Sequence, residues 1–216
     1  AAHALGAKYK KKPIGSISDF TTFSFQAIKH FTTGDGGMLT IKNKKLEEKA
    51  KRIRWFGIDR KKKQKGIWKN DVYEVGYKYQ MTDISATMGC DALNDFNKII
   101  NHRKKIYNTY LQELSKNKRI KCIHDFDKNK EHGAWLFTIC LNNKDFVQKK
   151  LRERFIETNQ VHFRNDRYSI FKKFVKGKKF PNMDYLENRY LVLPLHHKVS
   201  VQNVKYICKV INRFAK

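Results

Sequence analysis

The segment FSFQAIKHFTTGDGG, residues 23–37, places a lysine between an alternating aromatic pattern and a run of glycines. The sequence DFTTFSF, which starts at Asp19, alternates and is rich in Thr and Phe, so it predicts a strand. The sequence GMLTI after the glycines predicts a second short strand, with a polar loop over residues 26–36. Lys29 therefore lies in a loop at the end of a strand, a position where a lysine is not the expected residue.

Two interpretations of Lys29 are open from its position. Glycines such as Gly34, Gly36 and Gly37 allow a ligand to approach the backbone closely. Partial desolvation beside aromatic residues makes a lysine amine a better nucleophile for carbonyl carbons. The other interpretation is an ordinary surface lysine in a glycine-rich loop, and the pattern alone does not choose between them.

The composition is that of a globular protein with a large positive charge. With 216 residues, 40% of them hydrophobic, the chain is long enough for one or two domains with a sizeable core. The 47 Lys and Arg residues against 20 Asp and Glu give a formal net charge of +27, which makes a polyanion the first partner to consider. The alternative is an AT-rich coding bias, which enriches Lys, Asn and Ile without giving the surface a target.

The cysteines and the hydrophobic pattern exclude several classes of protein. No CxxC pair or zinc-ligand spacing is present, so we expect no metal and four free, buried thiols in a reducing cytoplasm: Cys90, Cys122, Cys140 and Cys208. No apolar run reaches the ~18 residues of a membrane-spanning helix. The first residues, AAHALGAKYKKKPIG, contain no signal-peptide core and no initiator Met, which predicts a piece of a longer protein.

Strands and helices are expected to alternate along the chain. The predicted elements are a basic turn at 8–13, a helix capped by Asn43, a mobile charged loop at 59–66 (DRKKKQKG), one or two long helices capped by Thr82 and extending to 114, a strand in AWLFTICL (134–141), a helix at 145–155, strands in QVHF (160–163) and RYLVLPL (189–195), and a final helix after Ser200. This alternation favours an α/β fold with a domain boundary in the region 85–115.

The lysine segment resembles the Schiff-base lysine segment of the DegT/DnrJ/StrS-type nucleotide-sugar aminotransferases. The resemblance continues, in order, through AAHALGA (1–7), GYKYQMTDISATMG (76–89), VHFRNDRYSIF (161–171) and LPLHHKVSVQNVKYI (193–207). It covers nearly the whole chain. It implies an aspartate-aminotransferase-like fold (pyridoxal-phosphate fold type I), with residues 1–85 forming the end of the large cofactor-binding domain and residues 86–216 forming connecting helices and a small C-terminal α/β domain.

The resemblance also assigns roles to individual residues. It implies that Lys29 forms the Schiff base with pyridoxal 5′-phosphate and then acts as general acid/base, that Ser24 binds the cofactor phosphate, and that His3 lies near the cofactor ring. Lys78 and Gln80 would reach across a dimer interface to the phosphate of the neighbouring site. Family members commonly have Asn and Arg at these two positions, so Lys and Gln depart from the pattern.

Further residues of the C-terminal part are assigned to the substrate side. The resemblance places His162 and Arg164 toward the sugar substrate, while the following Asn165 and Asp166 suit a turn. The family's aspartate that pairs with the pyridine nitrogen would precede Ala1. We therefore expect that these residues alone bind cofactor poorly and do not transaminate.

The function implied is transamination of a nucleotide-diphosphate keto-deoxysugar, with glutamate as amino donor, in surface-glycan synthesis by a cytoplasmic homodimer. The alternatives are a basic nucleic-acid-binding protein and a catalytically inactive relative. The basic runs KYKKK, RKKKQK and KKFVKGKK share no helix face, and we expect no interleaved exposed aromatics. No nucleic-acid-binding motif accompanies them, so they are interpreted as solvated loops and nucleic acid is not the expected partner.

Overall fold

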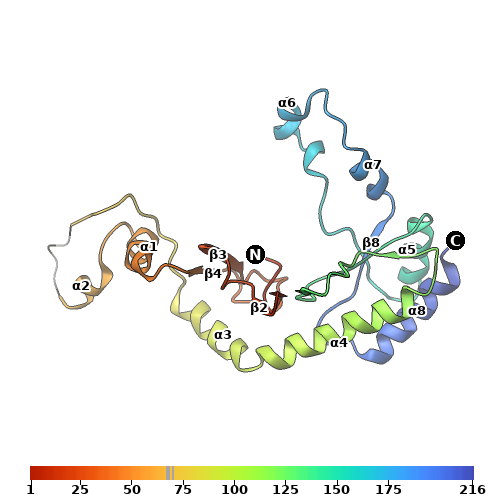
Figure 1. Ribbon diagram of the computed structural model, residues 1–216, viewed down its shortest axis with the longest axis horizontal. Helices are drawn as coiled ribbons and strands as arrows, with labels where there is room; N and C mark the ends of the chain where they lie inside the picture. Colours follow the sequence, from red (N-terminus) through yellow and green to blue (C-terminus); the bar gives the residue numbers. More distant parts are fainter. Residues whose placement is uncertain (67–68, 70) are drawn as a thin grey trace. The chain divides into compact units, whose positions relative to one another are not determined.

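The computed structural model describes residues 1–66, 69 and 71–216 and shows a mixed α/β chain. The chain divides into two compact units (Figure 1). Unit 1 contains residues 1–97 and 129–133, and unit 2 contains residues 98–128 and 134–216. Each unit is described by itself.

Unit 1 contains two small antiparallel sheets. The first has the order β2-β1-β6, with β1 at Lys8–Tyr9, β2 at Lys12–Pro13 and β6 at Lys130–Glu131. The second pairs β3 (Phe20–Ser24) with β4 (Gly37–Ile41), in a register that sets Ser24 opposite Gly37. Both predicted strands beside Lys29 and the predicted basic turn are confirmed.

Three of the four helices described in unit 1 begin at a side-chain cap. They are η1 (Lys44–Leu46), α1 (Glu47–Arg54), α2 (Arg60–Gln64) and α3 (Asp83–Asn94). Asn43 caps η1 and Thr82 caps α3, as the sequence predicts. The prediction of a loop over residues 59–66 is wrong where α2 forms. The Asp59 carboxylate accepts hydrogen bonds from the backbone of Lys61 and Lys62, and these bonds start a short helix.

Unit 2 is built around one hydrophobic core. The antiparallel sheet β5-β7-β8 consists of Lys121–Cys122, Phe137–Cys140 and Tyr190–Leu193. The helices α4 (Phe96–Leu114), α5 (Lys144–Arg152) and α8 (Val201–Phe214) supply most of the other buried side chains of this core. The long predicted helical region consists of two helices, since α3 ends at Asn94 and α4 begins at Phe96. The first two residues of α4 belong to unit 1.

Between α5 and β8 the chain makes an excursion of short helices, at the top of Figure 1. These are η2 (Asn165–Arg167), η3 (Ser169–Phe171), α6 (Lys172–Val175) and α7 (Pro181–Glu187). The strand predicted at 160–163 is wrong. Only Asn159 forms a bridge with Val192, and the carbonyl of His162 accepts a hydrogen bond from the Tyr190 hydroxyl rather than from a strand backbone.

The remaining predictions concern thiols and membrane helices. All four cysteines are free, with Cys140 and Cys208 buried as predicted, whereas Cys122 is half-buried and Cys90 is exposed. Among the helices described, none is long and apolar enough to cross a membrane. Within the described residues, no group of three or more His, Cys, Asp or Glu side chains is arranged to hold a metal ion.

Candidate functional site

The loop that carries Lys29 is closed at its base by backbone hydrogen bonds. The Phe25 N–H donates to the Gly36 carbonyl at 2.8 Å, and the Thr33 N–H donates to the Phe25 carbonyl at 2.9 Å. The first bond continues the β3–β4 ladder beyond the Ser24–Gly37 pair and the second joins the loop across its base, so the loop leaves and re-enters the sheet at fixed points. The lysine therefore has a defined location at the end of β3.

Lys29 lies in a turn with a buried histidine next to it. Its backbone N–H donates to the Gln26 carbonyl at 2.9 Å, and the residue is half-buried. The adjacent His30 is 5% exposed, and its Nε2 donates to the Gly133 carbonyl at 2.7 Å. This bond ties the loop to the segment that follows β6, 103 residues later in the sequence.

Two aromatic rings form the interior of the loop. Phe25 and Phe31 are buried and stacked, with ring centroids 4.8 Å apart, and Phe31 meets the edge of Phe96 at 6.1 Å. Such aromatic pairs add stabilisation beyond the apolar area that they bury. They hold the backbone on both sides of Lys29, which limits the positions that its side chain can reach.

The threonines of the loop satisfy its backbone. The Thr32 hydroxyl accepts from the Gly34 N–H at 2.9 Å and lies 3.1 Å from the Phe25 carbonyl, while the Thr33 hydroxyl donates to the Asp35 carbonyl at 2.9 Å. Sequence analysis did not identify either threonine or His30 as part of the site. The partner of His30 is remote in sequence, so no local spacing could have revealed it.

The glycines allow the loop to close against its neighbours. A Cβ at Gly37 would lie 2.4 Å from the Phe23 carbonyl oxygen, and one at Gly36 would lie 2.6 Å from the Thr33 hydroxyl. Gly36 also has φ +151°, where side chains are rarely accommodated. Close packing within the chain therefore explains why glycine occupies positions 36 and 37, whereas the space around Gly34 is open.

Ser24 supplies a hydroxyl at the end of β3. Its Oγ accepts a long 3.4 Å hydrogen bond from the Gln26 N–H, and no acceptor for its own proton is found among the described residues. A half-buried hydroxyl with a proton to donate is suited to a phosphate oxygen. The donor set of the loop, one hydroxyl and one lysine amine, thus fits a ligand that carries both a phosphate and an aldehyde.

The segment that contains His3 meets the Lys29 loop through Gly133. A Cβ at Gly133 would lie 2.9 Å from the Leu5 carbonyl oxygen, and the Gly133 carbonyl accepts the hydrogen bond from His30. His3 itself is exposed. Residues 1–7 and the lysine loop are therefore neighbours, although His3 and Phe25 are 22 positions apart in the sequence.

The segment of Lys78 and Gln80 ends against the other side of the loop. The Cε atom of Met81 lies 2.8 Å from the position of a Cβ on Gly36. Lys78 is exposed and forms a β-bridge with Trp55. The Gln80 Oε1 atom is buried, and no hydrogen-bond partner for it occurs in the part of the chain that the structure describes.

In unit 2, Arg164 lies in a cluster of carboxylates. Its guanidinium donates to both oxygens of Asp166, at 2.9 and 2.6 Å, and to the carboxylates of Asp184 at 2.6 Å and Glu187 at 3.3 Å. Hydrogen bonds to Asp166 and Asp184 raise the pKa of Arg164, and the same guanidinium lowers the pKa of Asp166. Arg164 thus links η2 to α7, and its contact with substrate stays a prediction.

The other residue predicted on the substrate side, His162, is exposed. Its ring centroid lies 6.4 Å from that of the buried Trp135, in a tilted arrangement. The Tyr190 hydroxyl fixes its backbone through the carbonyl. The structure therefore places His162 and Arg164 at the start of the excursion, where the backbone of His162 is bonded to the first residue of β8, Tyr190.

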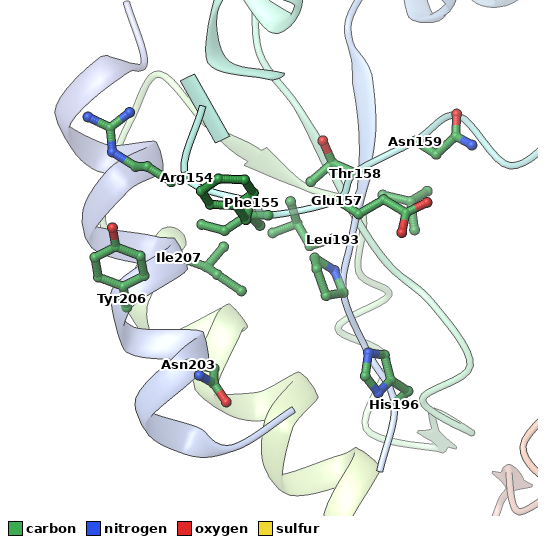
Figure 2. A pocket seen from close by; sticks show the side chains of 13 residues that line it. Arg154, Phe155, Glu157, Thr158, Asn159, Leu193, His196, Asn203, Tyr206 and Ile207 are labelled. Atoms are coloured by element: carbon green, nitrogen blue, oxygen red, sulfur yellow. The ribbon is translucent and has the colours of Figure 1, made fainter. Parts of the chain in front are cut away.

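A separate open pocket of about 560 Å³ lies beside α8 and β8 (Figure 2). Its lining includes Phe155, Leu193 and Ile207, with Thr158, His196 and Tyr206. Burial, followed by the nearby His197, lowers the pKa of His196. No lysine lines this pocket, so it does not provide the chemistry expected of the Lys29 loop.

A strand–lysine loop–strand arrangement followed by an α/β unit is the arrangement expected of an aspartate-aminotransferase-like protein. The sequence model of the DegT/DnrJ/EryC1/StrS aminotransferase family matches residues 1–212, and the chain belongs to this family. The predicted fold class is confirmed by solved structures. The PMP form of Spr1654 from Streptococcus pneumoniae superposes with a TM-score of 0.86 at 27% identity, over 99% of this chain and 57% of that one.

Curated relatives cover the chain to the same extent. MJ1066 from Methanocaldococcus jannaschii, an uncharacterised protein, is 34% identical over 99% of this chain and 58% of its own length. The UDP-4-amino-4,6-dideoxy-N-acetyl-beta-L-altrosamine transaminase of Campylobacter jejuni serotype O:23/36 is 31% identical over 96% of this chain and 55% of its own. The chain thus spans a little more than half the length of these relatives.

Proposed function

We propose that this chain supplies the cofactor lysine of a pyridoxal-phosphate-dependent sugar aminotransferase. The reaction would move an amino group from glutamate to a nucleotide-diphosphate keto-deoxysugar during surface-glycan synthesis. The observation that carries this proposal is the closed Phe25–Gly36 loop, which carries Lys29 and follows Ser24 at the end of β3, within a family match over residues 1–212. The altrosamine transaminase among the relatives supports the substrate class.

Each residue of the loop would have a distinct role. Pyridoxal phosphate, when bound, supplies the electron sink for the reaction. The Lys29 amine would hold the cofactor at its aldehyde carbon and, once released, would move a proton at the reacting carbon. Ser24 would donate its hydroxyl proton to the phosphate, and His3 would lie near the ring. The backbone bonds at Phe25 and Thr33 would keep the lysine within reach of the aldehyde carbon and of the reacting carbon.

The remaining residues would act across subunits or toward the sugar. In a homodimer in the cytoplasm, Lys78 and Gln80 would reach the phosphate in the partner subunit's site. The buried Gln80 Oε1, an acceptor without a hydrogen-bond partner in the described part of the chain, supports a hydrogen-bond donor from outside unit 1, whereas the amide nitrogen would be the group that donates to the phosphate. His162 would face the substrate, with Arg164 holding that segment against α7.

Cofactor affinity tests the role of Ser24. The assay uses the chain alone and the chain completed with the portion of the C. jejuni transaminase that it does not match. Ser24→Ala in the completed protein is expected to weaken binding of pyridoxal phosphate about tenfold, because a hydrogen bond to a charged group is lost. Binding of pyridoxal, which has no phosphate, should stay the same.

Thr22→Ala is the matched control, since it removes a hydroxyl from the same strand two residues away. Equal losses for both ligands, or equal losses in the two variants, would contradict the assignment of Ser24 to the phosphate. The chain alone is expected to bind cofactor more weakly than the completed protein.

A further inference from the structure

The excursion of unit 2 ends in a surface to whose residues the proposed function assigns no role. We call residues 168–180 the lysine–aromatic tip. Four large apolar side chains of the tip are exposed: Ile170 is 73% exposed, Phe174 59%, Tyr168 44% and Phe171 40%. The expectation that KKFVKGKK has no exposed aromatics beside it is therefore wrong, because η3 and α6 are too short to bury their apolar residues.

The tip carries a concentrated positive charge. Five lysines lie within it, and no Asp or Glu occurs between positions 167 and 183: Lys172, Lys173, Lys176, Lys178 and Lys179. None of the five forms an ion pair with any residue that the structure describes. The nearest carboxylates in the sequence are already paired, because Asp166 and Asp184 bind Arg164 and Glu187 also binds Arg167, which leaves this cluster a net charge of −1 against the five lysines. The field of the lysines is therefore not cancelled locally.

The base of the tip is held in place by the same ion pairs. Arg164 joins η2, which precedes the tip, to α7, which follows it. The Lys178 N–H donates to the Val175 carbonyl at 2.9 Å, and Gly177 has φ +75°, so a turn after α6 reverses the chain. Figure 1 shows α6 projecting away from β8 and α8. The tip therefore extends from a base held by the ion pairs of Arg164, which we call the Arg164 clamp, and does not pack on the core of unit 2.

The chemistry of the tip favours a bilayer over a nucleic acid. All five cations are lysines, which act as point charges and lack the planar fork with which arginine binds phosphate in a bidentate way. Three of the four exposed apolar side chains are aromatic, but Ile170, the most exposed of them, has no π face for stacking on a base. Apolar side chains surrounded by lysines suit the headgroup region of an anionic membrane, where each lysine near the surface contributes about 1 kcal/mol.

From these observations we infer that the lysine–aromatic tip docks the protein on an anionic phospholipid surface. The lysines would be attracted to the headgroups, and Ile170 and Phe174 would insert between them. This inference does not depend on cofactor binding. It adds peripheral membrane attachment to the proposed function.

Vesicle co-flotation of the whole chain tests this inference. The probes are phosphatidylcholine vesicles with and without phosphatidylglycerol. The unmodified chain should float only with phosphatidylglycerol present. Changing the five tip lysines to Gln should weaken apparent binding at least about tenfold, and the double change Ile170→Ser with Phe174→Ser should also weaken it severalfold. These side chains are exposed, so the far-ultraviolet circular dichroism spectrum should not change.

The matched control removes five exposed lysines of unit 1 instead, by changing Lys10, Lys11, Lys12, Lys44 and Lys45 to Gln. Both lysine variants lose the same net charge, so only the control should still float. No flotation of the unmodified chain, or equal loss in both lysine variants, would overturn the inference. So would a tip that binds a single-stranded oligonucleotide but not the vesicles, since the partner would then be a nucleic acid.

Discussion

The two units of the chain differ in how they bury apolar residues. Unit 2 contains a continuous core to which α4, α5, α8 and the strands β7 and β8 all contribute, with side chains such as Tyr110 and Ile211 fully buried. Among the described residues of unit 1, only Phe25 and Phe31 belong to the buried apolar set, and both lie in the loop of Lys29. Unit 2 is therefore stabilised by its core, whereas unit 1 concentrates its buried contacts at the candidate site.

Unit 1 also exposes large apolar side chains. Val75 is 82% exposed, Ile84 79% and Tyr79 70%, all on the stretch that includes Lys78 and Gln80. The proposed homodimer would bury part of this surface. The comparison suggests that unit 2 folds on its own contacts and that the geometry of the Lys29 site depends on what covers unit 1.

The largest expected effect separates the cores of the two units. Phe137→Ala should lower the free energy of unfolding of unit 2 by about 3–5 kcal/mol, because a fully buried ring is replaced by a cavity. Phe137 is 1% exposed and its ring contacts Tyr107 and Tyr110, at centroid distances of 4.9 and 5.0 Å. Urea unfolding followed by circular dichroism measures the change.

Leu39→Ala in unit 1 is the matched apolar truncation. Leu39 is 45% exposed, so its loss should change the unfolding free energy by no more than about 0.5 kcal/mol. Similar losses at positions 39 and 137 would show that the two units do not differ in core packing as described.

The next effect concerns the Arg164 clamp, the ion pairs that join Arg164 to the carboxylates at the base of the lysine–aromatic tip. Arg164→Met removes the donors to Asp166, Asp184 and Glu187 while keeping an apolar stem. The excursion should open, and trypsin at neutral pH should cleave at the tip lysines severalfold faster than in the unmodified chain. Arg154→Met is the control, since Arg154 lies in unit 2 outside this cluster. Unchanged cleavage in Arg164→Met would rule out the clamp.

The clamp should also depend on pH. Arg164 lowers the pKa of Asp166 from its usual 3.8, so the folded form binds this proton more weakly than the unfolded form does. The stabilisation is complete above pH 3.8 and is lost as the pH falls toward the lowered value. Pepsin cleavage of the excursion should therefore become faster as the pH falls below 3.8 in the unmodified chain. In Arg164→Met, the rate of cleavage should not depend on the protonation of Asp166.

Two helix caps provide a smaller, paired test. Ser200→Ala should destabilise unit 2 by about 1 kcal/mol, because the Ser200 hydroxyl and the Asn203 side chain form a reciprocal capping box on α8. Thr82→Ala removes the cap of α3, whose residues are all at least partly exposed. This substitution should speed hydrogen exchange of backbone amides in unit 1 only. A loss of unit 2 stability in Thr82→Ala would mean that the units do not behave separately.

The smallest effect is a gain in stability. Phe155 follows α5 with φ +57° and is 100% exposed at the open pocket beside α8, so its burial offsets none of the cost of a left-handed backbone. Phe155→Gly should raise the thermal midpoint of unit 2, by an amount that corresponds to about 0.5–1 kcal/mol. Phe155→Ala keeps the left-handed strain and serves as the control. An equal gain in Phe155→Ala would assign the effect to lost apolar exposure instead.

Local patterns predicted much of the fold because they act over short distances. The alternation in DFTTFSF, the cap at Thr82 and the periodicity after Ser200 specify β3, α3 and α8. The missed helix α2 depends on Asp59 accepting two backbone hydrogen bonds inside a lysine run, which has no apolar period. The strand expected at 160–163 failed because the Tyr190 hydroxyl competes for the His162 carbonyl, a contact 28 residues apart.

For the site, the sequence identified the lysine but not the parts that hold it. The Lys29 motif is contiguous, so it can be recognised directly. The hydrogen bond from His30 to Gly133 and the four-residue cluster around Arg164 join residues that are distant along the chain. Only the folded chain shows that Arg164 has three carboxylate partners.

The most direct test of the central claim is to map where pyridoxal phosphate attaches. The chain and its completed form described above are incubated with the cofactor, treated with borohydride to make the lysine–cofactor link permanent, and digested for peptide mass spectrometry. We predict label on the peptide with Lys29 in the completed form, none at that position in Lys29→Ala, and full label at Lys29 in the control Lys42→Ala. Label spread over the exposed lysines, with none preferred at Lys29, would contradict the account.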